Sequence, residues 1–216
     1  MFDVKNLSYT FEDGMNLFNN LSFKLHKGQR LGITGTIGAG KTTLLQLISG
    51  LNQNYEGEIK FYEEEVKSYS HESLSHHITQ VSQRPFLFAD SIRVNVAMDH
   101  ELSDEEIWKY LDLAGLKEDV ENFPYKLDTQ LGEWGINLSG GQKQRLTLAR
   151  ALARKPDVLL LDDCLSAVDT ITEEKILRNL DSFLKDSTII WIAHRQSTLK
   201  YCDFVFEIKG NHETVQ

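Results

Sequence analysis

Residues 35–43 have the types and spacing of a phosphate-binding loop. Two glycines precede a lysine and a threonine in the pattern Gly35-x4-Gly40-Lys41-Thr42. Glycine lets consecutive backbone N–H groups approach phosphate oxygens at the start of a helix. The lysine ammonium would then hold the β- and γ-phosphates, and the threonine hydroxyl would bind Mg2+. The residues predicted to bind nucleotide in this segment are Gly35, Thr36, Gly38, Ala39, Gly40, Lys41, Thr42 and Thr43.

Two further polar residues follow unbroken apolar runs. Asp162 comes directly after residues 158–161, and His194 directly after residues 189–193. Such runs are typical of parallel strands that are covered on both faces, and ligands of α/β sheets bind at the carboxyl ends of the strands. We therefore predict that Asp162 holds Mg2+ through water. The alternatives are a strand-end turn residue for Asp162 and a buried structural histidine for His194.

The segment Leu138-Ser139-Gly140-Gly141-Gln142 resembles the signature of ATP-binding cassette (ABC) proteins, and it stands in the family's order between the phosphate loop and Asp162. The resemblance extends along nearly the whole chain. It implies that ATP and Mg2+ are bound, and that two domains pair head to tail around two ATP molecules. Ser139, Gly140, Gly141 and Gln142 would then cover the nucleotide held by the second domain.

The resemblance also assigns catalytic residues. Gln83 matches the Q-loop glutamine, which also contacts the metal, and His194 matches the switch histidine. Asp163 stands where hydrolytic members of the family carry a glutamate. Loss of one methylene retracts the carboxylate by roughly 1 Å, which can lower a water-dependent rate about a hundredfold. We expect Asp163 to be a poor base, as in the slow half of heterodimeric exporters. The alternative is a tolerated replacement, with Gln83 or His194 positioning the water.

The adenine ring is expected to stack on an aromatic side chain near the N-terminus. Alignment with the family favours Phe11, with Tyr9 second. Either ring could instead belong to the core, because burial is common for aromatic side chains.

The elements that would position these residues indicate an α/β protein. A strand over residues 29–34, the glycine loop and a helix follow one another. Residues 85–150 are predicted to be mainly helical, with a capping box at Ser103 and Glu106, and another helix is expected to open at Thr170 with Glu173. The resemblance implies a P-loop NTPase (RecA-like) core with an N-terminal antiparallel β subdomain and an inserted helical subdomain. We expect a single domain, with residues 1–84 and 155–216 as the core and 85–154 as the helical part.

Composition narrows the class of protein. The chain has 216 residues, 41% of them hydrophobic, and a formal net charge of -9, which disfavours broad binding to nucleic acid. Two cysteines, Cys164 and Cys202, indicate a reducing compartment, and Cys164 is expected to be a small packing residue. The longest apolar runs are far shorter than the ~20 residues that span a bilayer. The basic residues that follow the signature, expected on a solvated helix face, are Lys143, Arg145, Arg150 and Arg154.

Two segments resemble the exporter branch of the family: residues 81–96, and residues 129–135, which in exporters contact the membrane partner. The resemblance implies an energy-coupling ATPase at the cytoplasmic face of the inner membrane. It implies two partners. One is the transmembrane domain of an exporter, in the same longer chain or in a separate subunit. The other is a second nucleotide-binding domain, in a homodimer or, as Asp163 favours, in a heterodimer. The alternatives are a soluble ABC ATPase acting on nucleic acid or ribosomes, and a regulatory ATP-binding module with little turnover.

Overall fold

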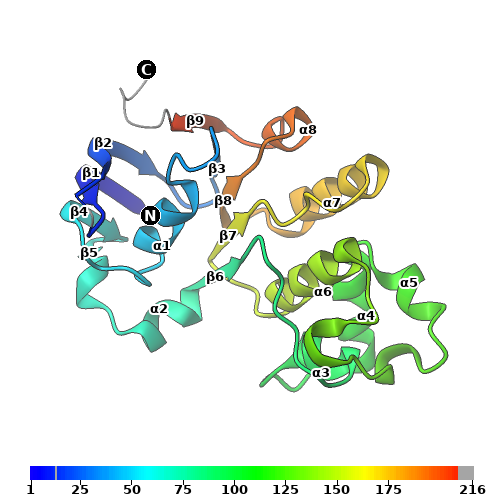
Figure 1. Ribbon diagram of the computed structural model, residues 1–216. Coiled ribbons are helices and arrows are strands. Elements are labelled where there is room, and N and C mark those ends of the chain that lie inside the picture. Colours follow the sequence, from blue (N-terminus) through cyan, green and yellow to red (C-terminus); the bar gives the residue numbers. More distant parts are fainter. Residues whose placement is uncertain (13, 209–216) are drawn as a thin grey trace. The chain divides into compact units, whose positions relative to one another are not determined.

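The computed structural model describes residues 1–12 and 14–208, with the side chain of Trp134 left aside (Figure 1). Its residues form two compact units. Unit 1 comprises Met1–Gln80, Asp157–Asp162 and the residues from Asp186 onward, and unit 2 comprises Val81–Pro156 and Asp163–Lys185. No helix within the described ranges is both long and apolar enough to cross a bilayer.

Unit 1 contains two sheets. The first has the strand order β2-β1-β4-β5 and antiparallel pairing. The second has the order β6-β7-β8-β3-β9, with β7, β8, β3 and β9 paired in parallel. The strands are β1 (Phe2–Thr10), β2 (Asn16–Leu25), β3 (Arg30–Gly35), β4 (Glu56–Phe61), β5 (Glu64–Glu65), β6 (Ile78–Val81), β7 (Val158–Asp162), β8 (Thr188–Ile192) and β9 (Phe204–Ile208).

The helices of unit 1 are short. They are α1 (Lys41–Ile48), the 3-10 turn η1 (Val66–Ser68), α2 (His71–His77) and α8 (Gln196–Leu199). Leu44, Leu45 and Ile48 of α1 are fully buried in one apolar cluster with side chains from both sheets. Every residue of β7 and β8 is buried, which confirms that these apolar runs are covered parallel strands.

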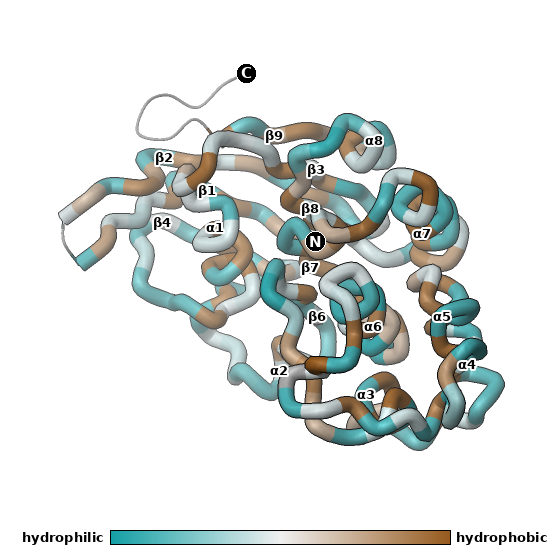
Figure 2. The backbone as a smooth tube through the Cα atoms, turned by 45° about the vertical axis from the view of Figure 1, so that its right-hand side comes forward, coloured by the Kyte–Doolittle hydropathy of each residue, from teal (hydrophilic) through white to brown (hydrophobic). Residues whose placement is uncertain are grey.

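Unit 2 is helical, as predicted for residues 85–150. Its helices are α3 (Ile92–Ala97), α4 (Asp104–Leu113), α5 (Lys117–Glu121), α6 (Gly140–Ala153) and α7 (Thr170–Phe183), with 3-10 turns η2 (Lys126–Asp128) and η3 (Glu133–Gly135). Hydrophobic and hydrophilic residues alternate around the turns of α4 and α7 (Figure 2), the pattern of helices that bury one side. The predicted capping box of Ser103 and Glu106 is present at the start of α4.

Helix α7 begins at Thr170, as predicted, but it is capped differently. The N-cap is Asp169, whose carboxylate accepts hydrogen bonds from the backbone N–H groups of Ile171 and Thr172 at 3.1 and 3.0 Å. Thr170 is the first helical residue, and Glu173 is buried. A short carboxylate one residue earlier accepts two N–H groups, so the capping box expected from Thr170 and Glu173 is wrong.

The division into units differs from the expected one at residues 163–185. These residues group with the helical unit instead of the core, because α7 packs against α4 and Asn179 donates hydrogen bonds to the carbonyls of Asp112 and Leu113.

The basic residues of α6 also differ from the prediction. Arg145 donates to the carbonyls of Gly115 and Gly141 and to the carboxylate of Asp119. Arg150 is largely enclosed and bonds backbone groups of the segment that precedes α4. A solvated helix face is therefore wrong for these two arginines, whose guanidinium groups find fixed acceptors within unit 2.

Candidate nucleotide site

The loop between β3 and α1 has the backbone of a phosphate-binding loop. Gly40 precedes α1 with φ +96°, and a Cβ there would lie 2.6 Å from the Leu17 side chain, so only glycine fits. Gly40 gives α1 no side-chain cap. The N–H groups at this helix start can therefore be satisfied by an anion, which the helix dipole also favours.

Lys41 folds back over this loop. Its ammonium group donates to the carbonyls of Gly35 and Thr36 at 2.9 and 2.8 Å, and the residue is 8% exposed. The side chain thus lies against the loop that would surround the phosphates. Contact of Lys41 with the β- and γ-phosphates stays a prediction.

Thr42 and Asp162 meet within unit 1. The Thr42 hydroxyl donates to the Asp162 carboxylate at 2.8 Å, and Asp162 is 4% exposed at the end of β7. A hydroxyl and a carboxylate are oxygen ligands of the kind that Mg2+ prefers, in a site completed by water and phosphate oxygens. The described part of the chain has no group of three or more His, Cys, Asp or Glu residues placed to hold a metal. The Thr42–Asp162 pair would supply the protein's oxygen ligands to a metal ion that arrives with a phosphate ligand.

His194 follows β8 at the same sheet edge. Ile192, two residues earlier, pairs with Asp162 across the β7–β8 ladder, and the N–H of Ala193 donates to Ile33 of β3 at 3.1 Å. The His194 side chain is exposed, unlike a buried structural histidine. The carboxyl ends of β3, β7 and β8 thus carry the loop, Asp162 and His194 on one edge, as the sequence predicts.

Unit 2 holds two other predicted residues together. The amide Nε2 of Gln83 donates to the carboxylate of Asp163 at 3.2 Å. Asp163 has φ +45°, in the left-handed region where aspartate is among the better tolerated residues. Asp163 is half-buried and Gln83 is exposed.

Residues 138–142, which we call the Ser139 motif, stand at the start of α6. The Ser139 hydroxyl accepts from the N–H of Gln142 at 3.2 Å, and the Gln142 side chain accepts from the N–H of Ser139 at 2.9 Å, which forms a capping box. A Cβ on Gly141 would lie 2.7 Å from the carbonyl oxygen of Ala167, so glycine is required for this packing. Ser139 and Gly140 remain exposed. The motif therefore presents a helix N-terminus on the surface of unit 2.

The aromatic residues at the end of β1 pack against the core. Tyr9 and Phe11 meet edge to face with ring centroids 5.2 Å apart, and both are partly buried against the cluster of unit 1. The Tyr9 hydroxyl accepts from Asn52 at 3.2 Å. This bond fixes Tyr9, whereas stacking of adenine on Phe11 stays a prediction.

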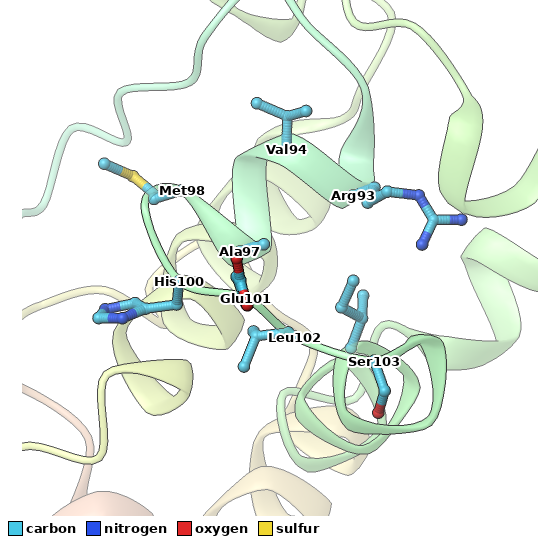
Figure 3. Close-up of a pocket in the computed structure, with 9 residues that line it drawn as sticks. Arg93, Val94, Ala97, Met98, His100, Glu101, Leu102 and Ser103 are labelled. Atoms are coloured by element: carbon cyan, nitrogen blue, oxygen red, sulfur yellow. The ribbon is translucent and has the colours of Figure 1, made fainter.

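A cavity of about 450 Å³ lies in unit 2 between α3 and the start of α4. Figure 3 shows its lining, with the side chain of Arg93 on α3 pointing away from that of Met98, which follows the helix. Arg93 is paired with Asp104 and Asp128. None of the predicted nucleotide residues lines this cavity.

Comparison with known proteins identifies the family. The model of the family described as "ABC transporter" matches residues 18–166, which include the phosphate loop, Gln83, the Ser139 motif and Asp162. The chain belongs to the ABC transporter family. It is the ATP-binding domain of that family, which confirms the predicted P-loop fold class and the ATPase assignment.

Relatives of this ABC domain are named as exporters. The chain is 38% identical over 210 residues to the Microcin-J25 export ATP-binding/permease protein McjD of Escherichia coli, covering 96% of this chain and 36% of that protein. It is 40% identical over 194 residues to the multidrug resistance-like ATP-binding protein MdlA of Escherichia coli (strain K12), covering 89% and 33%. The chain thus spans about a third of the length of these relatives.

A solved structure gives the same result. The structure titled "Structure of a bacterial Atm1-family ABC exporter with ATP bound" matches with a TM-score of 0.91 and 31% identity over 98% of this chain and 38% of that chain. The exporter-type assignment made from residues 81–96 and 129–135 is confirmed.

Sequence reasoning missed the hydrogen bonds that organise the segment after Gln83. Asn95 is fully buried and bonds Phe88 and Ser91, and Arg150 bonds Asn95 and Phe86. The available signal was an amide, Asn95, between the two valines Val94 and Val96. A polar residue on a buried helix face needs partners, and here they lie in the preceding loop.

Proposed function

We propose that this ABC domain binds ATP with Mg2+ and drives an exporter by pairing head to tail with a second nucleotide-binding domain. The main support for the proposal is that Lys41, the glycine loop and the Thr42–Asp162 pair all lie at one edge of a parallel sheet. The similarity to exporter proteins supports the transport role.

Each residue has a role in this proposal. The N–H groups of the loop and the Lys41 ammonium bind the phosphates, and Phe11 stacks on the adenine. Thr42, Asp162 and Gln83 hold Mg2+, which when bound offsets negative charge on the phosphate oxygens. His194 and Gln83 orient the attacking water together with Asp163. Ser139, Gly140, Gly141 and Gln142 complete the site of the second domain.

Hydrolysis at this chain's own phosphate loop is proposed to be slow. The carboxylate of Asp163 is one methylene shorter than glutamate and is bonded to Gln83 at 3.2 Å. An intact Ser139 motif would nevertheless complete a competent site on the second domain. This asymmetry supports a heterodimer, and it also favours a second candidate function, a regulatory ATP-binding module.

The transmembrane partner is proposed to contact unit 2 at the cytoplasmic face of the membrane. Phe86 and Phe88 are 49% and 40% exposed, and residues 129–131 pair with the chain beside them. Exposed aromatic side chains of this kind are typical of protein interfaces.

The head-to-tail arrangement can be tested in the assembled transporter with Ser139→Ala. ATP hydrolysis by the second domain should fall at least tenfold, whereas the ATP affinity of this chain's own loop should not change. Ser103→Ala is the matched control, because Ser103 caps α4 with the same capping box and its loss costs a similar stability, about 1 kcal/mol. Equal hydrolysis rates in the two variants would contradict the proposal.

A further inference from the structure

The loop that follows Gln83 is held by a buried amide. The side chain of Asn95 has 0% exposure. Its Nδ2 donates to the carbonyls of Phe88 and Ser91, both at 3.0 Å, and its Oδ1 accepts from the N–H of Phe88 at 3.0 Å. One side chain thus holds the middle and the end of residues 86–91, which we call the aromatic loop.

Arg150 of α6 closes over this arrangement. Its Nε and Nη2 donate to the backbone and side-chain oxygens of Asn95 at 2.7 and 2.6 Å, and its Nη1 donates to the carbonyl of Phe86 at 2.8 Å. The guanidinium also lies 5.3 Å from the centroid of the Phe88 ring. These three acceptors are neutral. Burial lowers the pKa of Arg150 to about 10, so the side chain still carries its charge at neutral pH.

The geometry requires arginine. Three acceptors are met by three nitrogens of one planar group, which the single ammonium of lysine cannot reproduce. The acceptors belong to the aromatic loop and to α3, whereas Arg150 belongs to the helix that begins after Ser139. Arg150 therefore joins the exposed Phe86 and Phe88 to the element that presents the Ser139 motif.

A second connection runs through the backbone. The N–H of Leu131 donates to Asp90 at 3.0 Å, and the N–H of Ile92 donates to Thr129 at 3.1 Å. The chain then leads from residue 131 to Ser139 through η3. The aromatic loop is thus bonded to the segment that leads into α6, at residues 129–131, and to Arg150 within α6. This helix is about 21 Å long.

We propose that Arg150 and Asn95 form a clamp that makes the aromatic loop and α6 one body, so that the partner contacted by Phe86 and Phe88 moves together with the Ser139 motif. This inference rests on the proposed function, because it takes the aromatic loop to meet the membrane partner. Arg150 and Asn95 are positioning residues in it and do not touch nucleotide.

The experiment is hydrogen exchange on the full transporter in lipid, with and without ATP and Mg2+. In the wild type, ATP should slow exchange both at residues 139–142 and at the aromatic loop. In Arg150→Lys the slowing at 139–142 should persist, the ATP response of the aromatic loop should vanish, and the Phe88 amide should exchange about tenfold faster. The kcat of ATP hydrolysis should fall while KM for ATP stays unchanged.

Two further variants keep the test decisive. Arg154→Lys changes another arginine at the end of α6 and should behave as the wild type. Asn95→Ser removes the side-chain acceptor of Arg150 Nη2 and the amide's bonds to Phe88 and Ser91. The double variant Asn95→Ser/Arg150→Lys should be no worse than the more affected single variant. Exchange at α4, which belongs to the same unit as the altered residues, reports whether each variant is folded.

The outcomes separate the two proposals. If ATP slows exchange at 139–142 but the aromatic loop of both Arg150→Lys and Asn95→Ser still follows ATP as in the wild type, the clamp is overturned alone. If the wild type shows no ATP response at 139–142, the head-to-tail site and the clamp that depends on it are both overturned.

Discussion

Asp163→Glu should accelerate the slow site of the assembled transporter. The added methylene extends the carboxylate by roughly 1 Å, and a displacement of this size changes the rate of an aligned reaction about a hundredfold. In the wild type, the Asp163 carboxylate accepts a hydrogen bond from the Gln83 amide at 3.2 Å. In the variant, the longer carboxylate must push this amide aside before it can contact a water molecule. Its φ of +45° suits aspartate better than glutamate, so the variant should also be slightly less stable.

Single-turnover phosphate release in lipid nanodiscs separates this site from that of the second domain. The slow phase should become up to about a hundredfold faster, with ATP affinity unchanged. Asp186→Glu, the same change at an exposed aspartate before β8, is the control and should have no effect. A slow phase that stays the same or becomes slower while ATP binding persists would refute the reasoning from carboxylate reach.

Three further predictions concern the elements around the site. Gly40→Ala should lower the free energy of unfolding by about 1–3 kcal/mol, because φ is +96° and the new Cβ would clash with Leu17. Gly38→Ala is the control: φ is +79° but the space around it is open, so its free energy of unfolding should fall less. Equal decreases in the two variants would contradict the packing argument. Thr42→Val should weaken ATP binding about tenfold in the presence of Mg2+ but not in EDTA, since only the metal needs the hydroxyl; equal loss in both conditions would exclude that role. Hydrogen bonds from Thr172, and to a lesser extent from the N–H of Ile171, hold the pKa of Asp169 below its ordinary value of 3.8. The stabilising effect of the carboxylate is therefore present above pH 3.8 and is lost as the pH falls through the lowered pKa. The difference in melting temperature between the wild type and Asp169→Asn should shrink on acidification, and a difference independent of pH would contradict the capping role.

The parallel sheet and the phosphate loop could be predicted from the sequence because their signals are local. Residues 158–161 and 189–193 are unbroken apolar runs, and the glycine loop needs its residue types at fixed positions. The strand predicted over residues 29–34 is found at Arg30–Gly35, a shift of one residue. Thr42 and Asp162 are 120 positions apart, yet the topology of the sheet edge was enough to expect them in one site.

Features that depend on tertiary packing were not predictable in this way. The sequence pointed to Thr170 with Glu173 at the start of α7, whereas the chain enters this helix so that Asp169 is the N-cap. Arg145 and Arg150 are long basic side chains on a polar-looking helix segment, but their acceptors Gly115 and Asn95 lie 30 and 55 residues away in the chain. Long side chains of this kind reach partners that no local pattern reveals.

The central claim is that the loop of residues 35–42 and the Lys41 ammonium bind the phosphates of ATP. Equilibrium binding of ATP with Mg2+ to the assembled transporter, wild type against Lys41→Ala, tests it most directly. The account predicts that the variant loses the binding site contributed by this chain, with affinity there reduced at least about a hundredfold by loss of charge-assisted hydrogen bonds. Unchanged affinity and an unchanged number of sites would contradict it.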